Sequence, residues 1–291
     1  MCLNTTENHY WKSQKETLAD LVGNPMSKSR KMMYGVVEEI VLRYSNRKAI
    51  AAWEVENELL LKADIGGPKR EWNGIKIPTM DEIAKFHSDV SIFIKNMDPN
   101  HLVTTGDSYR ESIWHLSQFS KGAKVNMWDK DTPEQLSGCV AFVQKGVDLF
   151  CIHDYINGVQ ETRLLLPKDW VTVANAAGQP LYIGEYGALP KPKDKNHEKF
   201  WSENPDWFTS YEGEDSVKAQ KIVEKGLQQI VIAKPALTHW WTYQSDRDMD
   251  QKNPQRFDIS LGRTPEIFHL IVAANRQLQM ETLGFTYMKD Q

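Results

Sequence analysis

Two glutamates each follow a short apolar run and could together cleave a polar bond by acid and nucleophilic catalysis. Glu58 ends the stretch Ala51-Ala52-Trp53-Glu54-Val55-Glu56-Asn57-Glu58, and Glu185 ends the stretch Pro180-Leu181-Tyr182-Ile183-Gly184-Glu185. A carboxylate is seldom buried without a partner or a task. One such residue alone could be a structural ion pair, but two at the ends of predicted strands favour an acid and a nucleophile that face one reaction centre.

The elements expected to position these glutamates alternate between strand and helix. Apolar residues recur at helical spacing in some segments, and short apolar runs that end in polar residues lie between them. This alternation predicts a parallel α/β sheet, and in a (β/α)8 barrel the carboxyl ends of the strands form the active-site face. We expect helices at 29–44, 79–97, 132–145, 170–177, 215–234 and from 264 onward, and strands at 49–58, 101–106, 147–155, 180–185 and 235–243.

The segments outside these elements are expected to be mostly loops. Residues 1–28 are polar, with a possible strand stub near Leu3, and residues 59–78 and 188–212 are rich in glycine or proline. Residues 108–131 are expected to be loop and short helix. Long loops in a compact domain are usually functional, so the aromatic residues Trp201 and Trp207 could bind a ligand or simply anchor their loop.

Several other polar residues near the predicted strand ends have two interpretations. His153 alone would more often be a core histidine, but Tyr155 two positions later favours a place in the site. Asp107 and Asp154 could line the cleft or cap helices, and capping is the expected role. Glu54 is expected to be structural, and Glu56 could be structural or functional.

Composition excludes some classes of function. The formal net charge is −4, and no basic block predicts nucleic-acid or membrane-surface binding. The three cysteines have no metal-ligand spacing, so buried reduced thiols are expected rather than a disulfide or a metal site. No G-x-S-x-G and no glycine fingerprint after a strand is present, which disfavours an α/β hydrolase and a nucleotide-binding domain.

Four motifs in this order resemble those of glycoside hydrolase family 5, a clan of retaining (β/α)8-barrel cellulases and mannanases. They are Trp53-Glu54-Val55-Glu56-Asn57-Glu58, His153-Asp154-Tyr155, Gly184-Glu185-Tyr186-Gly187 and Trp241-Thr242-Tyr243. The resemblance implies that Glu58 is the general acid/base and Glu185 the nucleophile. It further implies that Asn57, His153, Tyr155 and Trp241 bind substrate or orient these carboxylates, without metal or cofactor.

The resemblance also sets expectations for the whole chain. We expect one domain, residues 1–291, that cleaves a β-glucan or β-mannan by double displacement. Because Glu58 would end the fourth strand of such a barrel, the barrel is expected to be incomplete, starting near strand three. The alternative is a non-catalytic fragment or carbohydrate-binding remnant. The family implies a secreted or periplasmic protein, and the absence of a signal peptide keeps a cytoplasmic alternative open; the sequence leaves the oligomeric state open.

Overall fold

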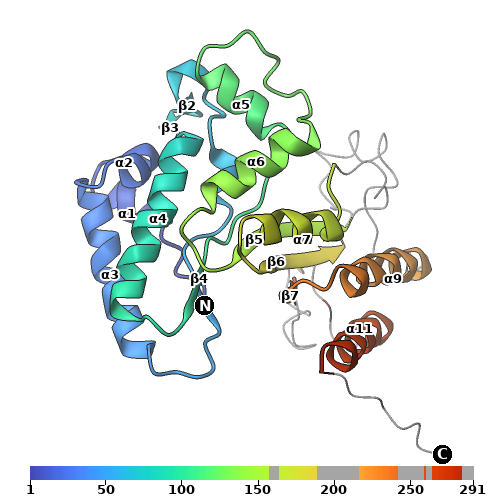
Figure 1. The fold of residues 1–291 in the computed structure, drawn as a ribbon. Coiled ribbons are helices and arrows are strands. Elements are labelled where there is room, and N and C mark those ends of the chain that lie inside the picture. Colours follow the sequence, from blue (N-terminus) through green and yellow to red (C-terminus); the bar gives the residue numbers. More distant parts are fainter. Residues whose placement is uncertain (157–163, 189–215, 242–258, 260–263, 284–291) are drawn as a thin grey trace, which may run out of the picture. The chain divides into compact units, whose positions relative to one another are not determined.

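The computed structural model describes residues 1–156, 164–188, 216–241, 259 and 264–283 (Figure 1). The chain forms two compact units. Unit 1 contains residues 1–153 and 172–182, and unit 2 contains residues 154–171 and 183–291. The chain passes between the units within strand β5 (Phe150–Ile156), helix α7 (Pro167–Ala176) and strand β6 (Leu181–Ala188).

Unit 1 contains parallel strands whose order follows the chain. Strand β1 (Ala52–Glu54) pairs in parallel with β4 (Leu102–Thr104), with Trp53 opposite Val103. Cys2 bridges Glu54 in parallel on the other side of β1, so the predicted strand stub near Leu3 is confirmed. Thr104 bridges Leu149 in parallel, just before β5. The predicted mixed α/β class with parallel strands is therefore confirmed in this unit.

Helices α3 (Lys28–Tyr44), α4 (Met80–Met97) and α6 (Pro133–Val143) lie side by side in unit 1 (Figure 1). Helix α4 begins with the predicted capping box, in which Thr79 accepts from the Glu82 N–H and the Glu82 carboxylate accepts from the Thr79 N–H. Its end is tied to β1, because the indole of Trp53 donates to Asp98 at 2.9 Å. This bond fixes the strand that leads to Glu58. The apolar face of α4 is buried and includes Ile83, Phe86, Val90 and Ile94.

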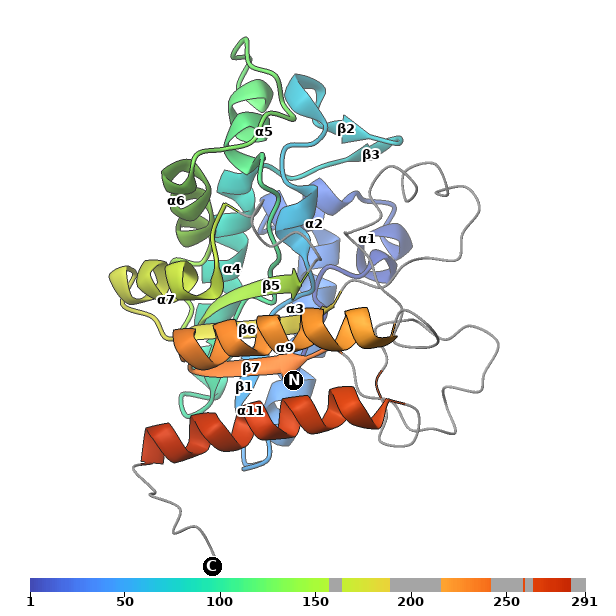
Figure 2. The ribbon, with the colours of Figure 1, turned by 90° about the vertical axis from the view of Figure 1, so that its right-hand side faces the viewer.

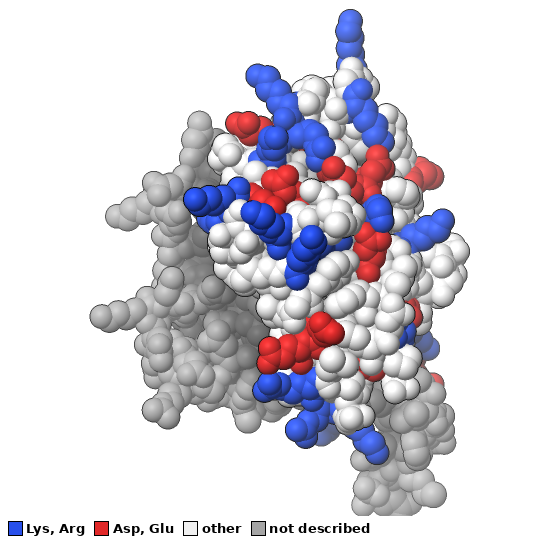
Figure 3. Space-filling model, turned by 90° about the vertical axis from the view of Figure 1, so that its left-hand side faces the viewer, with Lys and Arg blue, Asp and Glu red and all other residues white. Residues whose placement is uncertain are grey.

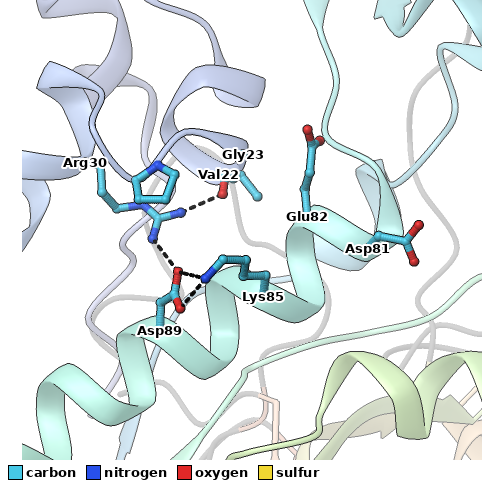
Figure 4. A pocket seen from close by; sticks show the side chains of 8 residues that line it. Val22, Gly23, Arg30, Asp81, Glu82, Lys85 and Asp89 are labelled. Carbon is cyan, nitrogen blue, oxygen red and sulfur yellow. Dashed lines mark hydrogen bonds and ion pairs between the residues drawn. The ribbon is translucent and has the colours of Figure 1, made fainter.

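A buried arginine joins α3 to two neighbouring helices (Figure 4). The Arg30 side chain is 1% exposed, and its Nε donates to the carbonyl of Leu21 at 2.7 Å. A second guanidinium nitrogen donates to the carbonyl of Val22, at the end of α2 (Leu18–Gly23). Asp89 of α4 lies 3.7 Å away as its ion-pair partner. The arginine thereby satisfies carbonyls at a helix end that have no partner within the helix.

Two segments predicted to be mostly loop contain regular structure. Residues 1–28 include α1 (Asn8–Ser13) and α2, because six-residue helices are too short to show a clear apolar period. Residues 59–78 include a hairpin that turns at Asn73 and Gly74, both with positive φ. An Asn-Gly pair is typical of hairpin turns, so the sequence itself could have predicted this one. The elements in 59–78 are η1 (Leu59–Lys62), η2 (Gly67–Lys69), β2 (Glu71–Trp72) and β3 (Ile75–Lys76).

The other predicted elements are present, with changes at their ends. The strand expected at 49–58 is limited to β1, and the residues after it continue as a hydrogen-bonded turn that carries Glu58. The short helix expected within 108–131 is α5 (Ile113–Ser120). The predicted loop at 188–212 lies outside the described residues apart from Ala188.

Strand β7 (Leu237–Trp240) lies in unit 2 and follows β6 in the sheet order β5-β6-β7. Helices α9 (Ser216–Ala233) and α11 (Pro265–Leu283) lie side by side (Figure 2), and Lys234 pairs with Glu281 at 2.7 Å. Helix α9 contacts β6 through Gly226, whose carbonyl accepts from the Tyr186 hydroxyl at 2.8 Å. A Cβ on Gly226 would lie 2.3 Å from Ile156, so the glycine permits this close approach.

The face of the molecule drawn in Figure 3 carries Lys and Arg side chains interspersed with Asp and Glu side chains. Among the helices of the described part of the chain, none has the length and apolar character needed to cross a bilayer. The three cysteines are free, as predicted; Cys139 and Cys151 are buried, whereas Cys2 is exposed.

Candidate active site

Glu58 lies in a tight turn directly after β1 in unit 1. Its backbone has φ 54° and ψ 35°, a left-handed conformation that is uncommon for a residue other than glycine. Its N–H donates to the carbonyl of Gly106 at 3.0 Å. The side chain is 32% exposed, and its Oε1 lies 3.1 Å from Nδ1 of the buried His153. The turn therefore presents a partly exposed carboxylate held by one ring nitrogen.

Gly106 makes this turn possible from the neighbouring strand. It follows β4 with φ 85°, and a Cβ at this position would lie 1.9 Å from the carbonyl oxygen of Glu56. Only glycine fits both the conformation and the space. The N–H groups of Val55 and Glu56 donate to Thr104 and Thr105, which extends the β1–β4 pairing up to the turn.

Glu185 lies in β6, in unit 2, and is buried. The hydroxyl of Tyr155, from β5, donates a hydrogen bond to its carboxylate. This is the contact expected from the sequence resemblance, and it fixes one carboxylate oxygen. Gly187 allows another close approach, because a Cβ there would lie 2.8 Å from the carbonyl oxygen of Trp241.

Trp240, the last residue of β7, and Trp241, which follows it, differ in exposure. Trp241 is 42% exposed, and its N–H donates to the carbonyl of Tyr186 at 2.8 Å. Trp240 is half-buried and its ring meets that of Tyr186 edge-on, with centroids 6.3 Å apart. Trp241 is therefore the more exposed of the two, and its role in sugar binding stays a prediction.

The six predicted site residues divide between the units. Asn57, Glu58 and His153 belong to unit 1, where Asn57 is exposed beside Glu58. Tyr155, Glu185 and Trp241 belong to unit 2. Within each unit the structure brings predicted partners into contact, His153 with Glu58 and Tyr155 with Glu185. The aromatic residues Trp201 and Trp207 lie outside the described residues.

Three buried polar side chains behind Glu58 form a cluster that the sequence did not assign as a group. Glu56 and His87 are 0% exposed and Asp107 is 1% exposed, and their ligand-type atoms lie within 4.8 Å of one another. Burial, and then the neighbouring Asp107 carboxylate, raises the pKa of Glu56 well above its usual range. Glu56 was left open as structural or functional. His87 lies on the buried, mostly apolar face of α4, so the sequence gives no sign that it differs from a core residue.

Glu56, His87 and Asp107 have the side-chain types of metal ligands, and the distances between them show whether they could bind one ion. Glu56 Oε1 lies 3.7 Å from Nε2 of His87, whereas Asp107 Oδ2 lies 3.7 Å from Nδ1, the other ring nitrogen. Nδ1 also lies 3.0 Å from the carbonyl of Val143, so it carries the proton. The two carboxylates thus approach different ring nitrogens, only one of which has a free lone pair, and the set does not converge as metal ligands must.

Glu54 and Asp107 have structural roles, as predicted. The Glu54 carboxylate accepts from the hydroxyl of Tyr182, and burial together with this carboxylate raises the pKa of that tyrosine. Asp107 accepts from the N–H of Leu60 at 2.9 Å, at the start of η1, which is a capping contact.

Comparison with known proteins gives sequence and fold similarity to mannan-degrading enzymes. The chain is 27% identical over 178 residues to mannan endo-1,4-beta-mannosidase F of Aspergillus fumigatus, covering 55% of this chain and 33% of that protein. The chain therefore spans about a third of the length of this curated relative. No protein-family model matches the chain.

Two solved structures share the fold. The endo-beta-1,4-mannanase of Thermotoga petrophila superposes with a TM-score of 0.57 at 17% identity, covering 98% of this chain and 57% of that one. A glycoside hydrolase family 5 mannosidase from Rhizomucor miehei gives a TM-score of 0.56 at 14% identity, covering 92% and 63%.

The chain has a mixed α/β fold with parallel strands, and its fold is similar to that of these two glycoside hydrolases. More particularly, the predicted resemblance to the cellulase- and mannanase-like enzymes of glycoside hydrolase family 5 is confirmed by these similarities. The fold neighbours are (β/α)8 barrels, and the mixed α/β fold of this chain matches 57% and 63% of their lengths.

Proposed function

We propose that this protein hydrolyses β-1,4-linked mannan by double displacement, with Glu185 as the nucleophile and Glu58 as the general acid/base. The observation that carries the proposal is the hydrogen bond from Tyr155 to the Glu185 carboxylate, because it holds the proposed nucleophile in one orientation. The similar enzymes act on mannan, which favours mannan over β-glucan as the substrate. We further propose that the chain forms part of a (β/α)8 barrel and is one domain.

In the first step, Glu185 attacks the anomeric carbon and the bond to the leaving oxygen breaks. Glu58 donates its proton to that oxygen, so that the leaving sugar departs as a neutral alcohol. In the second step, Glu58 takes a proton from water, which attacks the glycosyl-enzyme and releases Glu185. Retention requires the two carboxyl groups to stand about 5–5.5 Å apart across one sugar.

The surrounding residues have supporting roles in this mechanism. Tyr155 orients Glu185, and His153 orients Glu58 through its Nδ1 at 3.1 Å. Asn57 is exposed beside Glu58 and is suited to bind a sugar hydroxyl. The exposed ring of Trp241 is suited to stack on a sugar face. A polymeric substrate also favours the secreted or periplasmic location expected from the family.

Covalent labelling tests the proposal directly. The protein is incubated with 2-deoxy-2-fluoro β-mannosyl fluoride and, separately, with the β-glucosyl compound, and its intact mass is measured. We expect stoichiometric labelling by the mannosyl compound, mapped to Glu185 and absent in Glu185→Gln. Faster labelling by the glucosyl compound would reassign the substrate to β-glucan.

The second candidate function is a carbohydrate-binding remnant without catalysis. It is supported by the exposure of Asn57 and Trp241, since exposed amide and indole groups can bind sugar without any proton transfer. A folded chain that binds mannohexaose in calorimetry, yet is labelled by neither fluoride, would establish this alternative and reject hydrolysis by this chain.

A further inference from the structure

We propose that Glu56 and Asp107 are positioning residues that hold the left-handed turn of Glu58, with His87 closing their buried cluster. The inference rests on the proposed role of Glu58 as acid/base and adds the groups that set its position. It concerns unit 1 alone, where all four residues lie.

The two carboxylates bind the two backbone N–H groups that directly follow Glu58. Oε2 of Glu56 accepts from the N–H of Leu59 at 2.7 Å, and Oδ1 of Asp107 accepts from the N–H of Leu60 at 2.9 Å. The N–H of Glu58 itself donates to Gly106. Three successive N–H groups are thus held by three fixed acceptors, so the turn has little freedom to rotate.

Holding is needed because the conformation of Glu58 is strained. A left-handed backbone is unfavourable for a residue with a Cβ, so the surroundings must hold it in place. The hydrogen bonds that Glu56 and Asp107 accept from the N–H groups after Glu58 stabilise this conformation. Without them, the turn would relax and the Glu58 carboxyl would leave its place beside His153.

The second oxygen of each carboxyl group explains why His87 belongs to the cluster. Oε1 of Glu56, Oδ2 of Asp107 and Nε2 of His87 are buried and have no hydrogen-bond partner of their own. Two ionised carboxylates in this position would repel each other, so one proton on Glu56 lowers the cost of burial. Nε2 of His87 lies 3.7 Å from Oε1 of Glu56 and presents its lone pair to this carboxyl group, since Nδ1 is engaged with Val143. His87 comes from α4, so the cluster also ties the turn to that helix.

The first experiment measures the turn itself and does not depend on activity. Amide hydrogen exchange at Leu59 and Leu60 is followed in the full chain and in two pairs of variants. Glu56→Met and Asp107→Ala remove the acceptors, whereas Glu56→Gln and Asp107→Asn keep an acceptor oxygen of similar shape. We expect Glu56→Met to speed exchange at Leu59, and Asp107→Ala at Leu60, about tenfold or more relative to their amide partners. Unchanged exchange in both apolar variants overturns the proposal.

Loss of overall stability is separated from loss of positioning by a core variant. Met33→Ala removes a side chain that is 0% exposed in α3, far along the chain from the turn. It should raise exchange across unit 1 without singling out Leu59 or Leu60. If the acceptor-removing variants show only this uniform pattern, their role is general stability and the positioning claim fails.

The second experiment tests whether the held turn serves proton donation. A displaced Glu58 should slow hydrolysis of mannotetraose, whose leaving group needs a proton, about tenfold or more. It should have little effect on the first step with 2,4-dinitrophenyl β-mannoside, whose leaving group needs none. The amide variants should recover most of the mannotetraose rate. An equal loss on both substrates counts against positioning of the acid, whereas absence of Glu185 labelling in the unaltered protein would reject the proposed function instead.

Discussion

The Nδ1 of His153 lies 3.1 Å from Oε1 of Glu58, and the two residues come from β5 and from the turn after β1. The sequence suggested a substrate-binding role for His153, whereas its contact in the structure is with the proposed acid/base. A buried histidine in this position holds one oxygen of the Glu58 carboxyl group. In the proposed mechanism His153 therefore orients Glu58, and its role in substrate binding stays a prediction.

Replacement of His153 should consequently impair proton transfer more than binding. His153→Ala removes the bond to Glu58, and we expect kcat on mannan oligosaccharides to fall about 10–100-fold, since a hydrogen bond to a charged group is worth about 1.5–3 kcal/mol. His153→Asn is the matched control, because the Asn Nδ2 can take the place of Nδ1. A fall in both variants that is confined to KM would instead support sugar binding by His153.

The bond between Tyr155 and Glu185 leads to a prediction about the covalent step. Tyr155→Phe keeps the ring and removes only the hydroxyl that donates to the nucleophile. We expect labelling of Glu185 by the 2-fluoro mannosyl fluoride to slow about 10–100-fold, while the circular dichroism spectrum stays the same. Tyr10→Phe, a buried tyrosine of α1, serves as the control. Labelling at the unaltered rate in Tyr155→Phe would remove Tyr155 from the mechanism.

The close approach of Gly106 to the Glu56 carbonyl predicts a large effect of one added methyl group. Gly106 and Gly122 have almost the same backbone, with φ 85° and 87°, but only Gly106 has no space for a Cβ. Gly122→Ala should cost about 1 kcal/mol of unfolding free energy from backbone strain alone. Gly106→Ala should cost several kcal/mol, or leave the chain unfolded, by urea denaturation followed through tryptophan fluorescence. Equal effects would mean that the β1–β4 edge can move apart.

The buried guanidinium of Arg30 predicts which of two arginines in α3 is needed for folding. Arg30→Met leaves the carbonyls of Leu21 and Val22 without a donor and Asp89 without its cation, so we expect a loss of about 3–5 kcal/mol. Arg43→Met breaks an exposed pair with Glu39, both more than half exposed, and should change stability by less than about 0.5 kcal/mol. Urea unfolding of the two variants measures the loss of unfolding free energy in each. A similar small loss in both would contradict a structural role for Arg30.

The parts of the fold and site that the sequence could predict are those with local signals. Glu58, Tyr155 and Glu185 could be singled out because each ends a short apolar run. The spacing of Thr79 and Glu82 predicted the start of α4. The left-handed backbone of Glu58 has no local signal, since glycine is the residue expected there. It depends on Gly106 in the neighbouring strand, which is a tertiary contact. The cluster of Glu56, His87 and Asp107 is assembled from three elements, and only the fold brings them together.

The raised pKa of Glu56 predicts a pH dependence of stability with a definite sign. In the unfolded chain this carboxyl group ionises near its ordinary pKa of 4.5, whereas in the folded protein burial and Asp107 keep the proton bound to higher pH. The folded state then binds more protons, so the stabilisation from Glu56 is complete below pH 4.5 and is lost as pH rises toward the folded pKa. His87, Asp107 and Cys2 are the other titratable groups that face it.

Glu56→Gln removes this titration while it keeps an acceptor for Leu59. The stability of the variant relative to the unaltered protein should therefore rise with pH, by about 1.4 kcal/mol per pH unit in the interval where only the unfolded state ionises. Urea unfolding at half-unit steps between about pH 5 and 8 measures this slope. Glu39→Gln, an exposed glutamate of α3, should give a curve parallel to that of the unaltered protein. A parallel curve for Glu56→Gln as well would mean that Glu56 is ionised in the folded state. The proposal that Glu56 carries a proton within the buried cluster would then be wrong.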